Sequence, residues 1–110
     1  MEKESTKEQT FKALKGIRYI VINTDWGGFS LSDEAESRYK ELTGIADDDF
    51  AYYDIERDDP YLVQIVREMG MDANSMYASL KIVEIPGDVE WEIGEYDGKE
   101  WVAEKHRTWS

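Results

Sequence analysis

Apolar residues run without interruption from Tyr19 to Ile22, and this is the strongest pattern in the chain. Because no polar residue alternates with them, both faces of the segment are expected to be covered, which predicts a central β-strand over 18–23. Apolar and polar residues alternate over 80–85, where a second strand is predicted, and Pro86-Gly87 ends it.

Two helices are predicted from amphipathic spacing and from residues that begin and end helices. The first covers residues 33–43, because Ser32 is a good N-cap, acidic residues fill the first turn, and Gly44 ends the pattern. The second begins at Pro60, directly after the capping residue Asp59, and its apolar residues form a stripe that is expected to be buried.

A β-hairpin is predicted over 89–107, with its turn at Asp97-Gly98. A two-residue loop would set Glu95 opposite Glu100, which is an unfavourable pair of like charges. A three-residue loop sets Glu95 opposite Lys99 instead and gathers the apolar residues on one face. We therefore expect the three-residue loop.

These elements predict an α+β fold, in which a mixed, mostly antiparallel sheet of four to five strands carries two to three helices packed mainly on one face. A short segment over 50–55 would supply the fifth strand. Residues 18–110 are expected to form a single domain. Residues 1–17 are expected to be an N-terminal amphipathic extension, whose short helix over 7–15 must dock on another surface because it is marginal alone.

The composition is that of an acidic, folded domain, with 4 Trp, 7 Tyr, 3 Phe and a formal net charge of −12. This charge excludes nucleic acid as a direct partner, because phosphate groups require a basic surface. The absence of cysteine, of a signal peptide and of a membrane-length apolar run predicts a cytoplasmic protein without membrane contact. No catalytic constellation is recognisable, so neither an enzyme nor a cofactor is expected.

The loop between the first strand and the following helix is the first candidate site. Its glycines and hydroxyls, placed before a helix start, are suited to an anionic group, and an aromatic ring could stack on a nucleotide base. A cationic and aromatic C-terminus could complete the site. The predicted ligand-binding residues are Trp26, Gly27, Gly28, Phe29, Ser30, Ser32, His106, Arg107 and Trp109. The alternative to a binding site is that the loop is a tight turn whose aromatic side chains pack into the core. The cations of the C-terminus would then pair with glutamates of the hairpin.

The acidic middle of the chain is the second candidate site, because residues 33–59 carry eleven acids against three bases. Such a segment is either a solvated face or a surface that docks on a basic protein. The predicted partner-binding residues are Asp47, Asp48, Asp49, Tyr52, Tyr53, Asp54, Asp58 and Asp59. The run lacks the alternate spacing and the glycine of a calcium loop, so no metal site is expected. Self-association through the aromatic residues stays open.

Parts of the chain resemble a family of small proteins of phages, prophages and bacterial genomes. The resemblance is carried by the strings VINTDWGGFSLS (21–32), RDDPYLV (57–63), LKIVEIP (80–86), VEWEI (89–93) and EKHRTW (104–109). The family has no established activity. The resemblance covers about residues 18–110 and implies a phage-type protein that acts in the host cytoplasm, in counter-defence or host takeover. Two functions follow as hypotheses: sequestration of a small, nucleotide-derived anionic signal, or inhibition of a host or defence protein through the acidic face.

Overall fold

The computed structural model describes residues 16–105. The predicted helix over 7–15 and the three C-terminal candidate residues lie outside this range. The elements, in chain order, are β1 (Ile17–Asn23), α2 (Asp33–Thr43), η1 (Asp47–Asp49), η2 (Tyr52–Asp54), α3 (Pro60–Met69), η3 (Gly70–Ala73), β2 (Leu80–Pro86), β3 (Trp91–Tyr96) and β4 (Lys99–Glu104). Within residues 16–105, no helix has both the length and the apolar character needed to cross a lipid bilayer.

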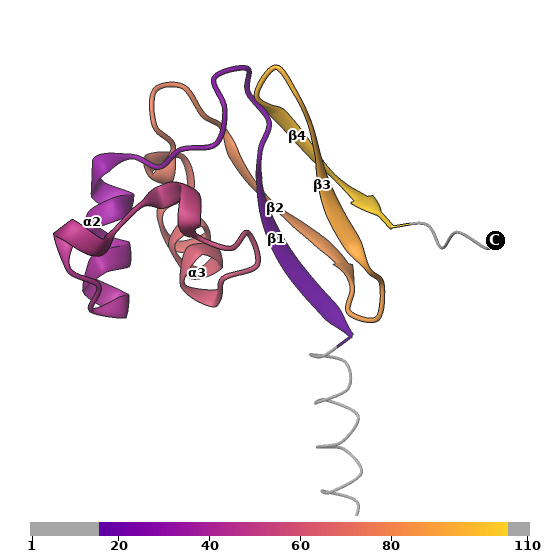
Figure 1. Cartoon of the computed structure of the whole chain (residues 1–110), viewed down its shortest axis with the longest axis horizontal. Coiled ribbons are helices and arrows are strands. Elements are labelled where there is room, and N and C mark those ends of the chain that lie inside the picture. The colour runs from indigo at the N-terminus through magenta and orange to yellow at the C-terminus, as the bar shows by residue number, and fades with distance from the viewer. Residues whose placement is uncertain (1–15, 106–110) are drawn as a thin grey trace, which may run out of the picture.

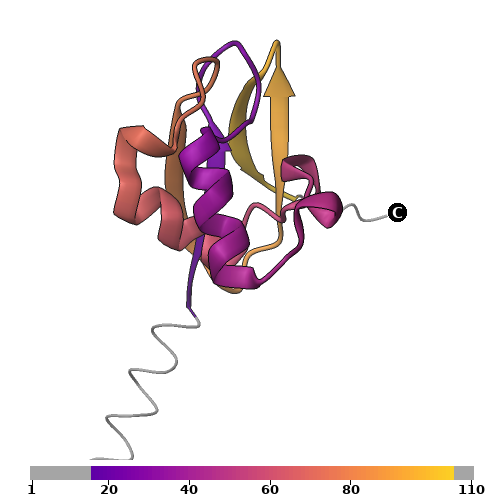
Figure 2. The same ribbon diagram turned by 90° about the vertical axis from the view of Figure 1, so that its left-hand side faces the viewer.

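The α+β class is confirmed, but the strands of the described residues form two antiparallel two-stranded sheets, β1–β2 and β3–β4. The helices lie on one side of the β1–β2 sheet and the β3–β4 hairpin lies on the other (Figure 1). Viewed from the helical side, α2 and α3 cover that sheet (Figure 2). The molecule therefore has three layers in this region, with β1–β2 in the middle.

The expected single sheet of four to five strands is not confirmed, and the outer edge of β1 explains why. The backbone N–H of Val21 donates to the carbonyl of Arg57 at 2.8 Å, and the N–H of Asn23 donates to the carboxylate of Glu100 at 2.8 Å. These groups would otherwise pair with a further strand. Because a loop carbonyl and a side chain satisfy them, the hairpin packs across β1 without joining its sheet.

The covering of β1 on both faces, which the sequence predicts, is confirmed. Val21 belongs to the core cluster shared with α2 and α3, which includes Leu62 and Ile65. Ile20 and Ile22 are also buried, and they project to the opposite face because side chains alternate along a strand. That face is the one on which the hairpin lies. Strand β1 is thus central although it pairs with only one other strand.

Both predicted helices are confirmed with their caps. Ser32 accepts a hydrogen bond from the backbone N–H of Ala35, and Asp59 accepts hydrogen bonds from the first turn of α3. Gly44 ends α2 in the left-handed region at φ 75°. The predicted strand over 50–55 is wrong, because the short 3-10 helix η2 occupies this region, shortly after η1. Its apolar residues anchor a loop to the core and do not form a strand.

The predicted three-residue hairpin loop is also wrong. Tyr96 pairs with Lys99, and Glu95 pairs with Glu100, around a two-residue turn. Asp97 and Gly98 both have positive φ, 51° and 90°, as a type I′ turn requires. The two carboxylates are separated by their bonding: Glu95 accepts from the backbone N–H at position 98, whereas Glu100 points into the molecule. The repulsion that argued against this register is therefore relieved by one hydrogen bond within the turn and one to β1.

Candidate functional site

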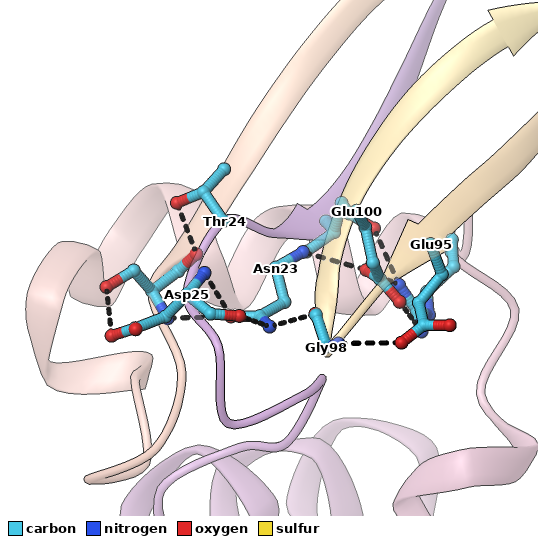
Figure 3. Close-up of polar contacts among 9 residues, drawn as sticks. Asn23, Thr24, Asp25, Glu95, Gly98 and Glu100 are labelled. Carbon is cyan, nitrogen blue, oxygen red and sulfur yellow. Dashed lines mark hydrogen bonds and ion pairs between the residues drawn. The ribbon is translucent and has the colours of Figure 1, made fainter.

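The buried side chain of Asn23 organises the loops at one end of the molecule (Figure 3). Its amide nitrogen donates to the carbonyls of Asp25 and Gly98, both at 2.7 Å. Its amide oxygen accepts from the backbone N–H groups of Ser79, at 2.9 Å, and Asp25, at 3.2 Å. Both donors and both acceptor positions of the amide are used. This one residue therefore joins the end of β1, the start of β2 and the hairpin turn.

Glycines of the loop after β1 and of the hairpin turn allow segments of the protein to approach one another closely. A methyl group on Gly27 would come within 2.2 Å of the carbonyl oxygen of Tyr77, and one on Gly98 within 2.2 Å of the carbonyl oxygen of Trp26. Gly28 has φ +89°, and no atom lies near the position that a methyl group would take. A glycine therefore suits this position because of its positive φ and not because of close packing. Three loops are in contact here through their backbones.

The two serine hydroxyls predicted to bind an anion make internal hydrogen bonds. Ser30 lies 2.5 Å from the hydroxyl of Ser75. Ser32 donates to the carbonyl of Asp72 at 2.6 Å and caps α2. An anionic ligand at these hydroxyls would have to replace these bonds, and the first turn of α2 already carries carboxylates. His106, Arg107 and Trp109 lie outside the described residues, so the shared hollow that they were predicted to complete stays a prediction.

Phe29 connects the two loops that the sequence identifies as separate candidate sites. The guanidinium of Arg57 lies 3.7 Å from the centroid of the Phe29 ring, and the Tyr52 ring lies 6.5 Å from it. Tyr52 in turn contacts Tyr53 edge to face, at 5.5 Å between centroids. The loop after β1 and residues 47–56 before α3, which we call the acidic loop, are therefore adjacent, and a row of aromatic rings runs between them.

Arg57 and Glu100 form an ion pair that the sequence reasoning missed. The guanidinium binds both carboxylate oxygens, one of them at 2.7 Å, and the Glu100 side chain is 7% exposed. Arg57 is consequently neutralised within the protein, although it stands in an acidic run. No local pattern identifies this pair, because the two residues lie forty-three positions apart in the sequence.

The acidic loop projects most of its charge into solvent. Asp47, Asp48, Asp49, Asp54 and Glu56 are all exposed. One of them, Asp47, contacts a base, the ammonium of Lys40, at 3.2 Å. The Tyr53 ring is 75% exposed beside these carboxylates.

Two acids of the predicted partner-binding set have structural roles. Asp59 caps α3 and accepts a hydrogen bond from the Tyr39 hydroxyl at 2.9 Å. Burial, and then this hydrogen bond, raises the pKa of Tyr39 to about 12. Asp58 is half-buried and lies 4.0 Å from Arg18. The surface available to a partner is therefore the acidic loop, and Asp58 and Asp59 lie outside it.

Other parts of the described surface carry less chemistry. A hollow of about 660 Å³ lies between β1 and α3, and Arg18, Val63 and Arg67 are among its lining residues. Arg67 stacks on the Tyr19 ring at 4.8 Å. Among residues 16–105, no group of three histidines or carboxylates is arranged to hold a metal ion.

No protein-family model, curated protein or solved structure matches this chain.

Proposed function

We propose that this protein is a non-enzymatic binding domain that docks on a basic surface of a host or defence protein through its acidic loop. The observation that supports it best is the group of five exposed carboxylates in this loop, of which Asp47 alone contacts a base within the described residues. A surface of one charge sign attracts its partner over a distance and orients it before contact.

The tyrosines give this charged surface a contact point. Tyr53 projects into solvent, and its ring rests edge to face on Tyr52, which packs in turn toward Phe29. Tyrosine is enriched among the residues that dominate interface energies, because a rigid ring buries much area at little entropic cost. Carboxylates around an exposed tyrosine are suited to arginine and lysine side chains of a partner.

Capture of a small nucleotide-derived anion is the competing proposal. It needs the loop after β1 and the C-terminal residues Arg107 and Trp109 to line one hollow. In the part of this site that lies within residues 16–105, Ser30 and Ser32 make internal hydrogen bonds. The carboxylates in the first turn of α2 would repel an anionic ligand there. The exposed acidic loop requires no such rearrangement, so docking on a protein is the better-supported function.

The test compares two triple variants that change net charge equally. Asp48→Asn, Asp49→Asn and Asp54→Asn remove three carboxylates from the acidic loop. Glu84→Gln, Glu90→Gln and Glu92→Gln remove three exposed carboxylates from β2, from the position before β3 and from β3. Each protein is immobilised, and the proteins that it retains from the producing cells are quantified by mass spectrometry. We expect the wild type and the second variant to retain the same basic protein and the first variant to lose it.

Two outcomes contradict docking through the acidic loop. Equal retention by both triple variants would show that the acidic loop is not the contact surface. A nucleotide retained by the purified protein in native mass spectrometry, without a protein partner, would support the competing proposal instead.

A further inference from the structure

Large apolar side chains are exposed on the three loops that meet around Asn23. We define the tip as residues 24–28, 75–78 and 95–99, which come together at the upper end of the molecule in Figure 1. Trp26 is 59% exposed, Met76 87%, Tyr77 64% and Tyr96 68%. Tryptophan, tyrosine and methionine are the residues that interfaces favour over the rest of a surface. Their concentration on one set of loops indicates a contact surface.

The backbone under these side chains is fixed before any partner arrives. The Asn23 amide makes three hydrogen bonds with the tip and a fourth with Ser79, directly after it, and both Gly27 and Gly98 lie against neighbouring backbone. A surface whose backbone is already ordered loses little conformational entropy on binding. The exposed rings are therefore presented at defined positions, as binding anchors require.

A cation already occupies the face of one of these rings. The ammonium of Lys99 lies 4.5 Å from the centroid of the Trp26 ring. Tyr96 is the cross-strand partner of Lys99, so its side chain projects from the same face of the hairpin. The tip holds three carboxylates, Asp25, Glu95 and Asp97, against this single ammonium. Its charge and its exposed ring thus both favour a positively charged group.

We propose that the tip is a second interaction surface, which binds an arginine or lysine side chain of a protein partner on the Trp26 ring in the place of Lys99. An exposed cation–π contact is weak, so the internal ammonium is readily exchanged. A planar guanidinium gains more on an indole face than an ammonium does, because it can also stack. This surface shares no residue with the acidic loop, so the two proposals can be tested independently.

The test is an NMR titration of the whole protein with the blocked peptide acetyl-Gly-Arg-Gly-Arg-Gly-amide, followed at the indole N–H of Trp26. We expect saturable shifts at Trp26 and Tyr96, which Trp26→Ala abolishes at Tyr96. Lys99→Ala should tighten binding about two- to fivefold relative to Lys81→Ala, which removes an equal charge from an exposed site on β2. Unchanged side-chain amide signals of Asn23 would show that each variant keeps the tip folded.

Three results would overturn this inference: equal affinities for Lys99→Ala and Lys81→Ala, shifts confined to the acidic loop, or shifts at Trp26 with AMP but not with the peptide. The loop variant that carries Asp48→Asn, Asp49→Asn and Asp54→Asn should keep the peptide shifts at Trp26. Loss of these shifts in that variant would mean that the peptide binds the acidic loop, and it would contradict a separate site at the tip.

Discussion

Asn23→Asp tests the organisation of the loops with almost no change in side-chain shape. The amide of Asn23 donates two hydrogen bonds, to the carbonyls of Asp25 and Gly98, both at 2.7 Å. A carboxylate has no hydrogen to donate, so two short donor contacts become contacts between oxygens. The loss of two hydrogen bonds costs about 1 kcal/mol each. The buried negative charge of the new carboxylate, which faces two carbonyl oxygens, adds to this cost, so we expect a destabilisation of about 3 kcal/mol.

Thermal unfolding monitored by circular dichroism measures this effect. A loss of about 3 kcal/mol in a domain of this size lowers Tm by roughly 10–20 °C. The destabilisation should be smaller at pH 4 than at pH 7, because a protonated carboxyl regains one donor. The folded state holds that proton more tightly than the unfolded state, so the stability of the variant falls as pH rises.

Asn74→Asp is the matched control. The oxygen of Asn74 accepts from the backbone N–H of Leu80 at 2.8 Å, and a carboxylate can accept the same bond. We expect a change of less than about 1 kcal/mol for this variant, although it carries the same added charge. Equal stability of Asn23→Asp and the wild type at pH 7 would refute the hydrogen bonds assigned to Asn23. An equal loss of stability in Asn23→Asp and Asn74→Asp would show that the added charge alone causes the effect.

Three further predictions concern single contacts. Arg57→Leu should destabilise the fold by about 2–3 kcal/mol, because it leaves the Glu100 carboxylate buried without its cation. A double-mutant cycle with Glu100→Gln, measured by urea unfolding, should show that the effects of the two substitutions on the free energy of unfolding are strongly coupled. Gly98→Ala should cost well over the ~1 kcal/mol expected for Gly44→Ala in the same assay, because both have positive φ but only the first meets neighbouring backbone. The pKa of Tyr39 is raised from 10.0 to about 12, which predicts that the stability of the fold falls as pH rises from 10 toward 12. Tyr39→Phe should make this decline less steep. An unchanged slope in Tyr39→Phe would contradict the prediction.

The helices were predictable from the sequence because their signals are local. Ser32 and Asp59 lie next to the turns that they cap, and Gly44 ends α2 in the conformation that glycine favours. The covering of β1 was also predictable, since an unbroken apolar run has no polar side to expose. These features depend on residues close together in the sequence.

The hairpin register was not predictable by the same reasoning. Cross-strand charge favours Glu95 opposite Lys99, but the observed register puts Glu100 where Arg57, forty-three positions earlier, binds it. The energy of that ion pair is invisible to any pattern within the hairpin. The absence of a larger sheet has the same origin, because Glu100 also satisfies the edge of β1.

The sequence indicated both candidate loops but not their relation. Trp26 and Tyr53 are exposed, as binding residues must be, whereas Phe29 packs under Arg57. The contact between Phe29 and Tyr52 joins segments more than twenty residues apart, and only the folded chain places them together. Exposed aromatic positions on loops were thus visible as candidates, while the surface that they form depends on tertiary packing.

The most direct test of docking through the acidic loop is the affinity for the captured basic partner, measured by isothermal titration calorimetry at low and high salt. Loss of three exposed carboxylates, each contributing about 0.2–1 kcal/mol, predicts that Asp48→Asn, Asp49→Asn and Asp54→Asn together weaken binding by roughly 3- to 140-fold at low salt. The same variant should depend less on salt than the wild type does. An affinity that neither salt nor this variant changes would contradict the account.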